Sequence, residues 1–214
     1  PSLKQQIRVW LILSTVMSIF LPNVVVCTIM VPVAVSMLQF LGEGNIRSSR
    51  VALPILLAIV WGAGIGGFGS PLGGAANLVA INYLEQLTGK EFMYIDWLSR
   101  FLPFLFLIML LNLFFLERIP VPGQQLGETK QYFSKLYAEL GKMKDGEKIS
   151  LILFLAAMLL SFSRPLFADI FPALKPAYIF LICGFMTFLF EDENGKSLLS
   201  WEQAGWCALM SCED

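Results

Sequence analysis

The polar groups of this sequence that could bind a small ion lie in two interruptions of otherwise apolar stretches. Pro22 and Asn23 interrupt the apolar run 9–41, and a glycine-rich segment, 66–77, interrupts the run 51–87. Backbone that leaves the helical path at membrane depth persists only where it lines a cavity or a site. Two Gly- and Pro-interrupted segments of this kind are typical of the binding site of a membrane transporter.

The composition indicates a membrane protein. Hydrophobic residues make up 57% of the chain and charged residues 14%, against about 45–50% and about 25% in soluble domains. With a net charge of −1 and no basic stripe, the sequence gives no indication of nucleic-acid binding. We therefore expect a multi-pass protein of the cell (cytoplasmic) membrane, whose partners include the lipid bilayer.

The sequence predicts neither an enzyme nor a resident metal or cofactor. It contains no His, and its four cysteines have no metal-ligand spacing: Cys27, Cys183, Cys207 and Cys212. The apolar surroundings of Cys27 and Cys183 favour small buried side chains. No Asp or Glu lies within 9–41 or 51–84, so a nucleophile–base pair is missing as well.

The lengths of the apolar stretches predict an all-α polytopic fold with two unusual elements. At about 1.5 Å per residue, the segment 9–20 is too short to cross a hydrocarbon core of about 30 Å, and 9–41 run straight is too long. A re-entrant helical hairpin over 9–41, with its tip at Pro22 and Asn23, resolves the mismatch. A discontinuous transmembrane helix over 51–87 and a span over 100–117 follow.

The remaining sequence divides into a polar linker and a second apolar region. The segment 120–148 is charged and carries apolar residues at helical spacing, which predicts a cytoplasmic amphipathic linker helix at the membrane surface. A solvated linker helix without lipid contact is the alternative. Two further spans are expected over 149–163 and 176–190. The chain begins without Met and stops in an apolar stretch, so we expect a fragment of a longer protein.

The distribution of Lys and Arg favours the hairpin. If 9–41 is re-entrant, eleven of the 15 basic residues share one side of the membrane, whereas a spanning 9–41 leaves nine on that side. Basic residues concentrate on the cytoplasmic side of membrane proteins. The four on the opposite side are Lys90, Arg100, Arg164 and Lys175.

These motifs resemble the ion-transporter superfamily. The pattern from Ser18 through Asn23 to Pro32, followed by GGFGSPLGGAANL at 66–78, is most similar to the divalent anion:sodium symporter (DASS) family of permeases. The pair Trp201 and Trp206 resembles the start of that family's second half. The resemblance implies an inverted-repeat transporter, with 1–119 as the first-repeat transport core and 149–214 as the start of a truncated second repeat. It also implies a homodimer.

The resemblance, together with the chemistry of the two breaks, gives a set of site residues. The family's hairpin tip is Ser-Asn-Thr and here it is Pro22-Asn23-Val24; its second loop ends in Gly-Thr-Pro-Pro-Asn, where this chain has Gly73-Gly74-Ala75-Ala76-Asn77. Because Na⁺ is bound by uncharged oxygens at broken helices, we expect one sodium ion at Ser18, the Pro22 carbonyl, Asn23 and the Gly73 carbonyl. The expected contacts of the anion are Asn23, Ser70, Gly74, Asn77 and the amides at the start of a helix over 77–87.

Plainer interpretations exist for some of these residues. Asn23 can merely cap a helix that begins at Val24. Gly62 and Gly64 are interpreted as small residues that let two helices approach. Gly69, Gly73 and Gly74 are interpreted as opening the backbone.

The predicted function is sodium-coupled symport of a small anion, a (di)carboxylate or an inorganic anion, by alternating access. Two alternatives are open at this point. One is a sodium/proton antiporter or metalloid-oxyanion exporter of the same superfamily, although proton exchange usually requires intramembrane carboxylates. The other is a membrane subunit without transport activity.

Overall fold

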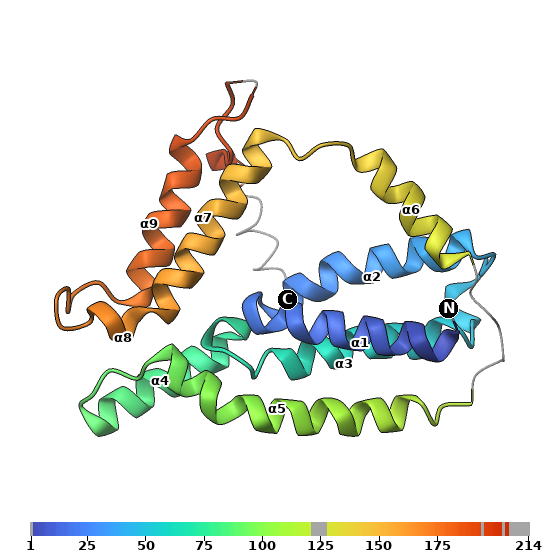
Figure 1. Cartoon of the computed structure of the whole chain (residues 1–214), viewed down its shortest axis with the longest axis horizontal. Helices are drawn as coiled ribbons and strands as arrows, with labels where there is room; N and C mark the ends of the chain where they lie inside the picture. The colour runs from blue at the N-terminus through green and yellow to red at the C-terminus, as the bar shows by residue number, and fades with distance from the viewer. Residues whose placement is uncertain (1, 121–127, 194, 203, 206–214) are drawn as a thin grey trace. The chain divides into compact units, whose positions relative to one another are not determined.

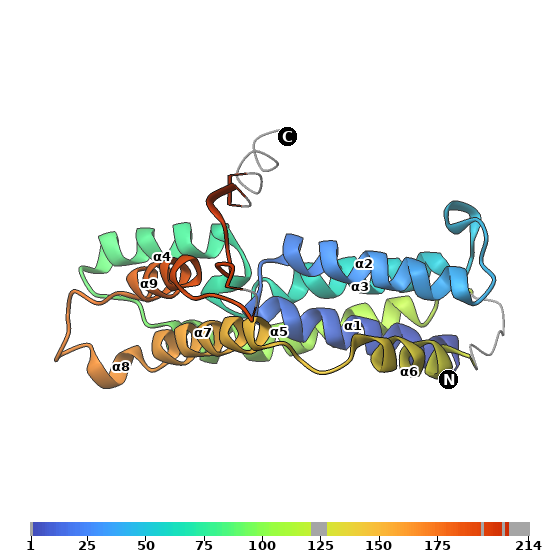
Figure 2. The ribbon, with the colours of Figure 1, turned by 90° about the horizontal axis from the view of Figure 1, so that it is seen from above.

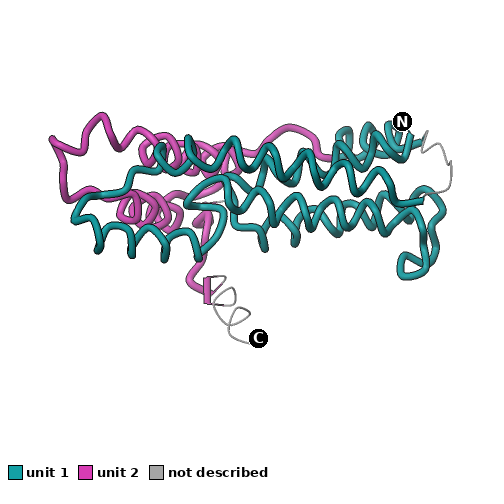
Figure 3. Tube along the Cα trace, turned by 90° about the horizontal axis from the view of Figure 1, so that it is seen from below, with its two compact units in different colours: residues 1–139 teal, residues 140–214 magenta. Residues whose placement is uncertain are grey.

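The computed structural model describes residues 2–120, 128–193, 195–202 and 204–205. These residues form helices and no β-sheet. The chain divides into two compact units, Pro1–Glu139 and Leu140–Asp214 (Figure 3). Part of the predicted linker (121–127) and three residues singled out in the sequence, Trp206, Cys207 and Cys212, lie outside the described residues.

The first unit opens with two antiparallel helices joined by a two-residue turn. Helix α1 (Leu3–Phe20) ends where Leu21 becomes extended, with φ −118° and ψ 147°, and α2 (Asn23–Phe40) begins directly after Pro22. A residue that precedes proline is disfavoured in the helical region, and proline offers no N–H to the helix before it. The hairpin shape expected for 9–41 is therefore present, with both open ends on one side (Figure 1). Its re-entry into a membrane remains a prediction.

Helix α1 starts six residues earlier than its apolar run. Ser2 accepts the Gln5 N–H, and the Gln5 side chain accepts the Ser2 N–H, which together form a capping box. This reciprocal pair satisfies two of the amides that a helix start leaves free. The expected start of the hairpin at residue 9 is wrong because hydropathy alone ignores a polar first turn that is well capped.

The second interrupted stretch forms two helices with a non-helical connection. Helix α3 (Ala52–Gly66) is followed by a 3₁₀ turn, η2 (Pro71–Gly73), and by α4 (Ala75–Thr88). The Ser70 side chain accepts the Leu72 N–H and so starts the turn. Helix α4 begins two residues before the expected 77. We call residues 67–74 the break.

Helices α1, α2 and α3 lie side by side and form the core of the first unit (Figure 2). Leu11, Met37, Leu38, Ile55 and Ile59 are fully buried between them. In a bilayer, helices with such side chains are held together by close van der Waals packing. The hydrophobic core therefore holds the hairpin against α3.

Helix α5 (Tyr94–Leu116) returns along this core. It begins six residues before the expected span at 100–117, because the mixed polar and apolar segment 94–100 is also helical. Arg100 lies within α5, over the Phe92 ring at 5.5 Å. At its other end, the Arg8 Nε lies 2.5 Å from Glu117 Oε1. The Arg8 hydrogen bond holds the pKa of the Glu117 carboxyl below its usual range. This ion pair joins the open end of the hairpin to α5.

Helix α6 (Thr129–Leu140) lies in the predicted linker and packs on the hairpin. Its Phe133 ring lies 6.2 Å from Trp10, and its Tyr132 ring lies 5.3 Å from Phe40. Tyr137 is 80% exposed and turns away. The amphipathic pattern is therefore used in part for packing against the hairpin.

The second unit contains α7 (Asp145–Phe162), α8 (Arg164–Phe167) and α9 (Pro176–Leu189). Arg164 is 1% exposed and donates hydrogen bonds to the carbonyls of Phe171 and Pro172, at 3.0 Å each. A buried guanidinium with such partners fixes the connection between α8 and α9.

By length and composition, two helices of the described residues could cross a membrane, α2 and α5. Helices α3 and α9 are apolar but shorter. The all-helical fold is thus confirmed, and the two long apolar helices are consistent with a membrane protein. The inverted repeat remains a prediction.

Candidate functional site

The hairpin tip is joined to the break by hydrogen bonds from two serines. Ser18, fully buried at the end of α1, donates its hydroxyl to the Ala63 carbonyl of α3 at 2.7 Å. Ser70, in the break, donates its hydroxyl to the Ile19 carbonyl of α1. Two segments about fifty positions apart in the sequence therefore form one polar centre.

Glycine at three positions permits this approach. A methyl group on Gly66 would overlap the Thr15 carbonyl oxygen and come within 2.8 Å of the Ser18 Cβ. A methyl group on Gly73 would lie 2.7 Å from the Ser18 carbonyl oxygen. On Gly62 it would lie 2.6 Å from the Leu11 carbonyl oxygen. Real Cβ atoms do not approach backbone so closely, so these positions require glycine.

The same geometry tests the interpretation of Gly62 and Gly64 as small residues between two helices. Gly62 lies against α1 as expected, whereas a methyl group on Gly64 would meet no described residue within 4 Å. The interpretation of Gly64 as a contact residue is therefore wrong. Residues 62 and 66 are one helical turn apart and share a face, and residue 64 lies on the opposite face.

The Ser18 carbonyl is an acceptor without a helical donor. Its donor in a continuous helix would be the N–H of residue 22, which is proline and has none. No hydrogen bond reaches this oxygen from the residues that the structure describes. A buried carbonyl normally has a partner. This one lies beside Gly73 at the junction of tip and break, where a cation could bind it.

Asn77 fixes the shape of the break. It is 7% exposed, and its amide nitrogen donates to the carbonyls of Gly67 at 2.6 Å and Ser70 at 2.8 Å. Both oxygens belong to the break, and the Ser70 carbonyl also accepts the Gly73 N–H at 3.2 Å. The side chain thus replaces the missing helical hydrogen bonds of the break.

The predicted sodium ligands lie in different environments. Ser18 and Gly73 are brought together, as described above. The Pro22 carbonyl accepts the Val26 N–H at 3.1 Å, the first bond of α2. Asn23 is exposed, and its Oδ1 accepts the Val24 N–H at 2.8 Å. Pro22 is the N-cap of α2 and Asn23 its first residue, so α2 begins one residue earlier than the capping interpretation of Asn23 expects.

The predicted anion contacts are also divided. The side chains of Ser70 and Asn77 are buried and bonded to backbone, as described above. Gly74 is half-buried and extended, and serves as N-cap of α4. Ala75 and Ala76, the first residues of α4, are exposed. Helix α4, at whose start the anion contacts are predicted, therefore begins at residue 75 instead of 77.

Sequence reasoning missed the Ser18 main-chain carbonyl, although the signal was present. A Ser followed four residues later by Pro in a helical run must leave its carbonyl without a donor. The two hydrogen bonds of Asn77 could not be predicted in this way, because the positions of the Gly67 and Ser70 carbonyls depend on the path of the break.

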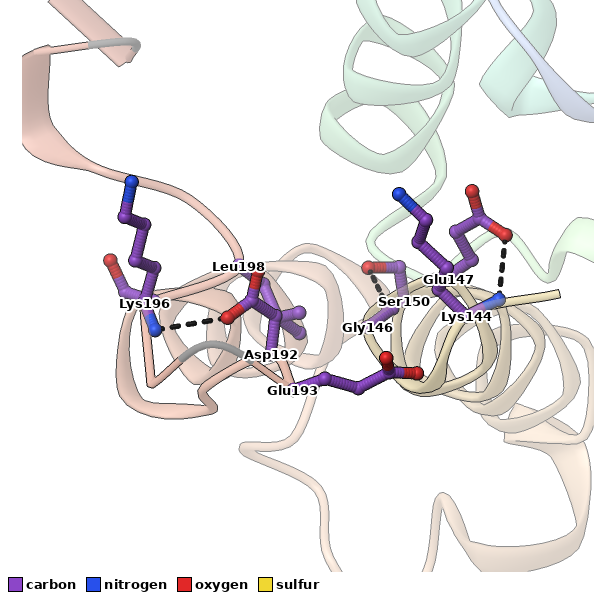
Figure 4. A pocket seen from close by; sticks show the side chains of 9 residues that line it. Lys144, Gly146, Glu147, Ser150, Asp192, Glu193, Lys196 and Leu198 are labelled. Atoms are coloured by element: carbon purple, nitrogen blue, oxygen red, sulfur yellow. Dashed lines mark hydrogen bonds between the residues drawn. The ribbon is translucent and has the colours of Figure 1, made fainter.

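A polar cleft in the second unit is lined by groups that stabilise a helix start (Figure 4). It has a volume of about 600 Å³ and lies at the start of α7, beside the 191–198 turn. Glu193 accepts the Asp145 N–H at 2.9 Å, and Glu147 accepts the Lys144 N–H at 3.0 Å. These carboxylates satisfy free amides of a helix start. Among the described residues, no group of His, Cys, Asp and Glu could hold a metal ion.

Comparison with known proteins identifies the family. Residues 2–192 match the citrate transporter family, CitMHS. The chain belongs to this family. The predicted resemblance to the ion-transporter superfamily and its sodium-dependent anion carriers is thereby confirmed.

Two curated relatives are similar to this chain over part of their length. A sodium-dependent dicarboxylate transporter from Staphylococcus saprophyticus is 24% identical over 207 residues, which cover 88% of this chain and 39% of the relative. A sodium-dependent high-affinity dicarboxylate transporter from Caenorhabditis elegans is 28% identical over 160 residues, 66% of this chain and 28% of the relative. The chain thus spans about two fifths or less of these relatives.

Proposed function

We propose that this chain carries the first binding half of a sodium-coupled secondary transporter of small anions. The transporter works by alternating access in the cell membrane, as a homodimer. Its anion is a dicarboxylate or a related (di)carboxylate, as in the names of the relatives, or an inorganic anion. The observation that carries the proposal is the Ser18 carbonyl, which lacks a helical donor and lies beside Gly73 where tip and break meet.

The chemistry of this junction suits sodium. The groups assembled there are backbone carbonyls, serine hydroxyls and an amide, all uncharged oxygen donors. We assign the ion to Ser18, the Pro22 and Gly73 carbonyls and the Asn23 side chain. The Pro22 carbonyl keeps its helical hydrogen bond and offers its second lone pair. Asn23 must turn its Oδ1 from the Val24 N–H to reach the ion.

The anion site lies on the other side of the same backbone. The free amides at the start of α4 and the partial positive charge of the helix N-terminus attract an anion. We assign Asn23, Ser70, Gly74 and Asn77 to this site. Ser70 and Asn77 contribute by hydrogen bonds to backbone carbonyls that fix the path of the break. A sodium ion beside the tip strengthens anion binding through its own charge, and this provides a physical basis for coupled transport.

Replacement of Asn23 by alanine tests the ion assignment. In the complete gene product, reconstituted in liposomes, Asn23→Ala is expected to raise the sodium concentration for half-maximal uptake of labelled succinate by about tenfold, because one ligand is lost. Citrate and sulfate serve as further probes. Asn45→Ala is the matched control, since Asn45 is exposed in the loop after α2 and its side chain accepts the Arg47 N–H at 3.2 Å. A sodium dependence that Asn23→Ala leaves unchanged would contradict the assignment.

A further inference from the structure

We propose that Trp97, on α5, is a positioning residue for the ion site because it holds the backbone of the break in place. Its indole Nε1 donates a hydrogen bond to the Phe68 carbonyl at 2.9 Å. Trp97 lies in the second turn of α5, 29 residues beyond its acceptor. The contact therefore joins a third element to the junction of tip and break.

The surroundings of Trp97 hold the indole in one orientation. The side chain is 5% exposed. Its ring stacks on Phe101 with centroids 4.5 Å apart and an angle of 24°, and meets the edge of Phe92 at 6.3 Å. Aromatic pairs of this geometry are attractive beyond their buried area. The donor is thus held in place before any ion binds.

The Phe68 carbonyl needs such an external donor. Glycines flank Phe68 on both sides and allow the backbone many conformations. The Phe68 side chain is 55% exposed and cannot anchor the segment by burial. Asn77 holds the carbonyls before and after, at Gly67 and Ser70. Together, Asn77 and Trp97 hold the backbone of residues 67–70 on two sides.

Fixing this backbone sets the position of the ion ligands. The Gly67 carbonyl lies against Gly73, which in turn lies beside the Ser18 carbonyl. A break free to change its path would present these oxygens in several arrangements, and sodium binding would then have to select one. Loss of the Trp97 hydrogen bond should therefore weaken sodium binding with little effect on the maximal rate.

Trp97→Phe removes the N–H and keeps an aromatic ring in the stack. Trp10→Phe is the matched control, because Trp10 is 4% exposed and its Nε1 has no acceptor among the described residues. Both variants lose a buried indole, but only one loses a hydrogen bond. In the complete gene product, Trp97→Phe is expected to raise the half-saturating sodium concentration about fivefold with an unchanged maximal rate. Trp10→Phe leaves this concentration unchanged.

A second measurement does not depend on transport. Hydrogen exchange of the amides of residues 67–70 is expected to be about fivefold faster in Trp97→Phe than in Trp10→Phe, with the core of α1 and α3 unchanged. The inference rests on the proposed function only for the sodium readout. If wild-type protein shows no sodium-dependent uptake, the proposed function fails, and exchange still tests the hold on the break. Equal exchange and equal half-saturation in the two variants would overturn the inference.

Discussion

Gly66→Ala is expected to destabilise the protein strongly and to abolish transport. The new methyl group would overlap the Thr15 carbonyl oxygen and approach the Ser18 Cβ. The first of these atoms belongs to helical backbone and cannot rotate away, so α1 must shift off α3. Overpacking of this kind costs about 1–3 kcal/mol, occasionally more. The shift also separates Ser18 from its Ala63 acceptor, which now lies 2.7 Å away.

Gly64→Ala is the matched control for this prediction. It lies on the same helix, and its methyl group meets nothing within 4 Å. Alanine favours a helix over glycine by about 1 kcal/mol, so this variant should be neutral or slightly more stable. Thermal unfolding in detergent and succinate uptake in liposomes measure both variants. Similar melting temperatures for the two would show that α1 and α3 do not approach at Gly66.

Asn77→Ala is expected to reduce uptake at least tenfold and to lower the melting temperature. The amide nitrogen donates to the carbonyls of Gly67 and Ser70, at 2.6 and 2.8 Å. The Ser70 carbonyl keeps the Gly73 N–H at 3.2 Å, whereas the Gly67 carbonyl loses its donor, which costs about 1–3 kcal/mol for a buried acceptor. The break should then lose its shape, and the sodium and anion sites with it.

Asn112→Ala is the control for the loss of an asparagine amide. Asn112 is half-buried in α5, and its amide donates to the Ile108 carbonyl at 2.9 Å, within the same continuous helix. The Ile108 carbonyl belongs to a regular helical turn. Removal of the Asn112 amide therefore leaves no non-helical backbone without support. Uptake within twofold of wild type is expected. If Asn77→Ala behaves like Asn112→Ala, the break does not depend on this amide.

The order of the helices and the two interruptions could be predicted from the sequence, but the contacts between them could not. Pro22 predicted the turn between α1 and α2, because a proline both ends one helix and can begin the next. The glycine-rich segment predicted the end of α3 at Gly66. The start of α1 was missed because hydropathy weighs Leu3–Arg8 as polar, although Ser2 and Gln5 form a recognisable capping pattern.

The contacts of the site could be predicted only in part. The spacing of Gly62 and Gly66 places them on one helical face, so their approach to α1 was readable from helical periodicity, as was the opposite direction of Gly64. The bonds of Ser70 to Ile19 and of Trp97 to Phe68 join positions far apart in the chain. Their existence depends on how the break folds, and no local pattern encodes that path.

The sidedness of the hairpin tests the central claim most directly. All native cysteines of the complete gene product are replaced, and single cysteines are placed at Ser2 or Ser48, which are exposed before α1 and in the turn η1 (Ile46–Ser48) after α2. A membrane-impermeant thiol reagent then labels intact cells. The re-entrant hairpin predicts that both positions react from the same side. Reaction from opposite sides would mean that residues 9–41 span the membrane, and the sodium site proposed at the tip would be wrong.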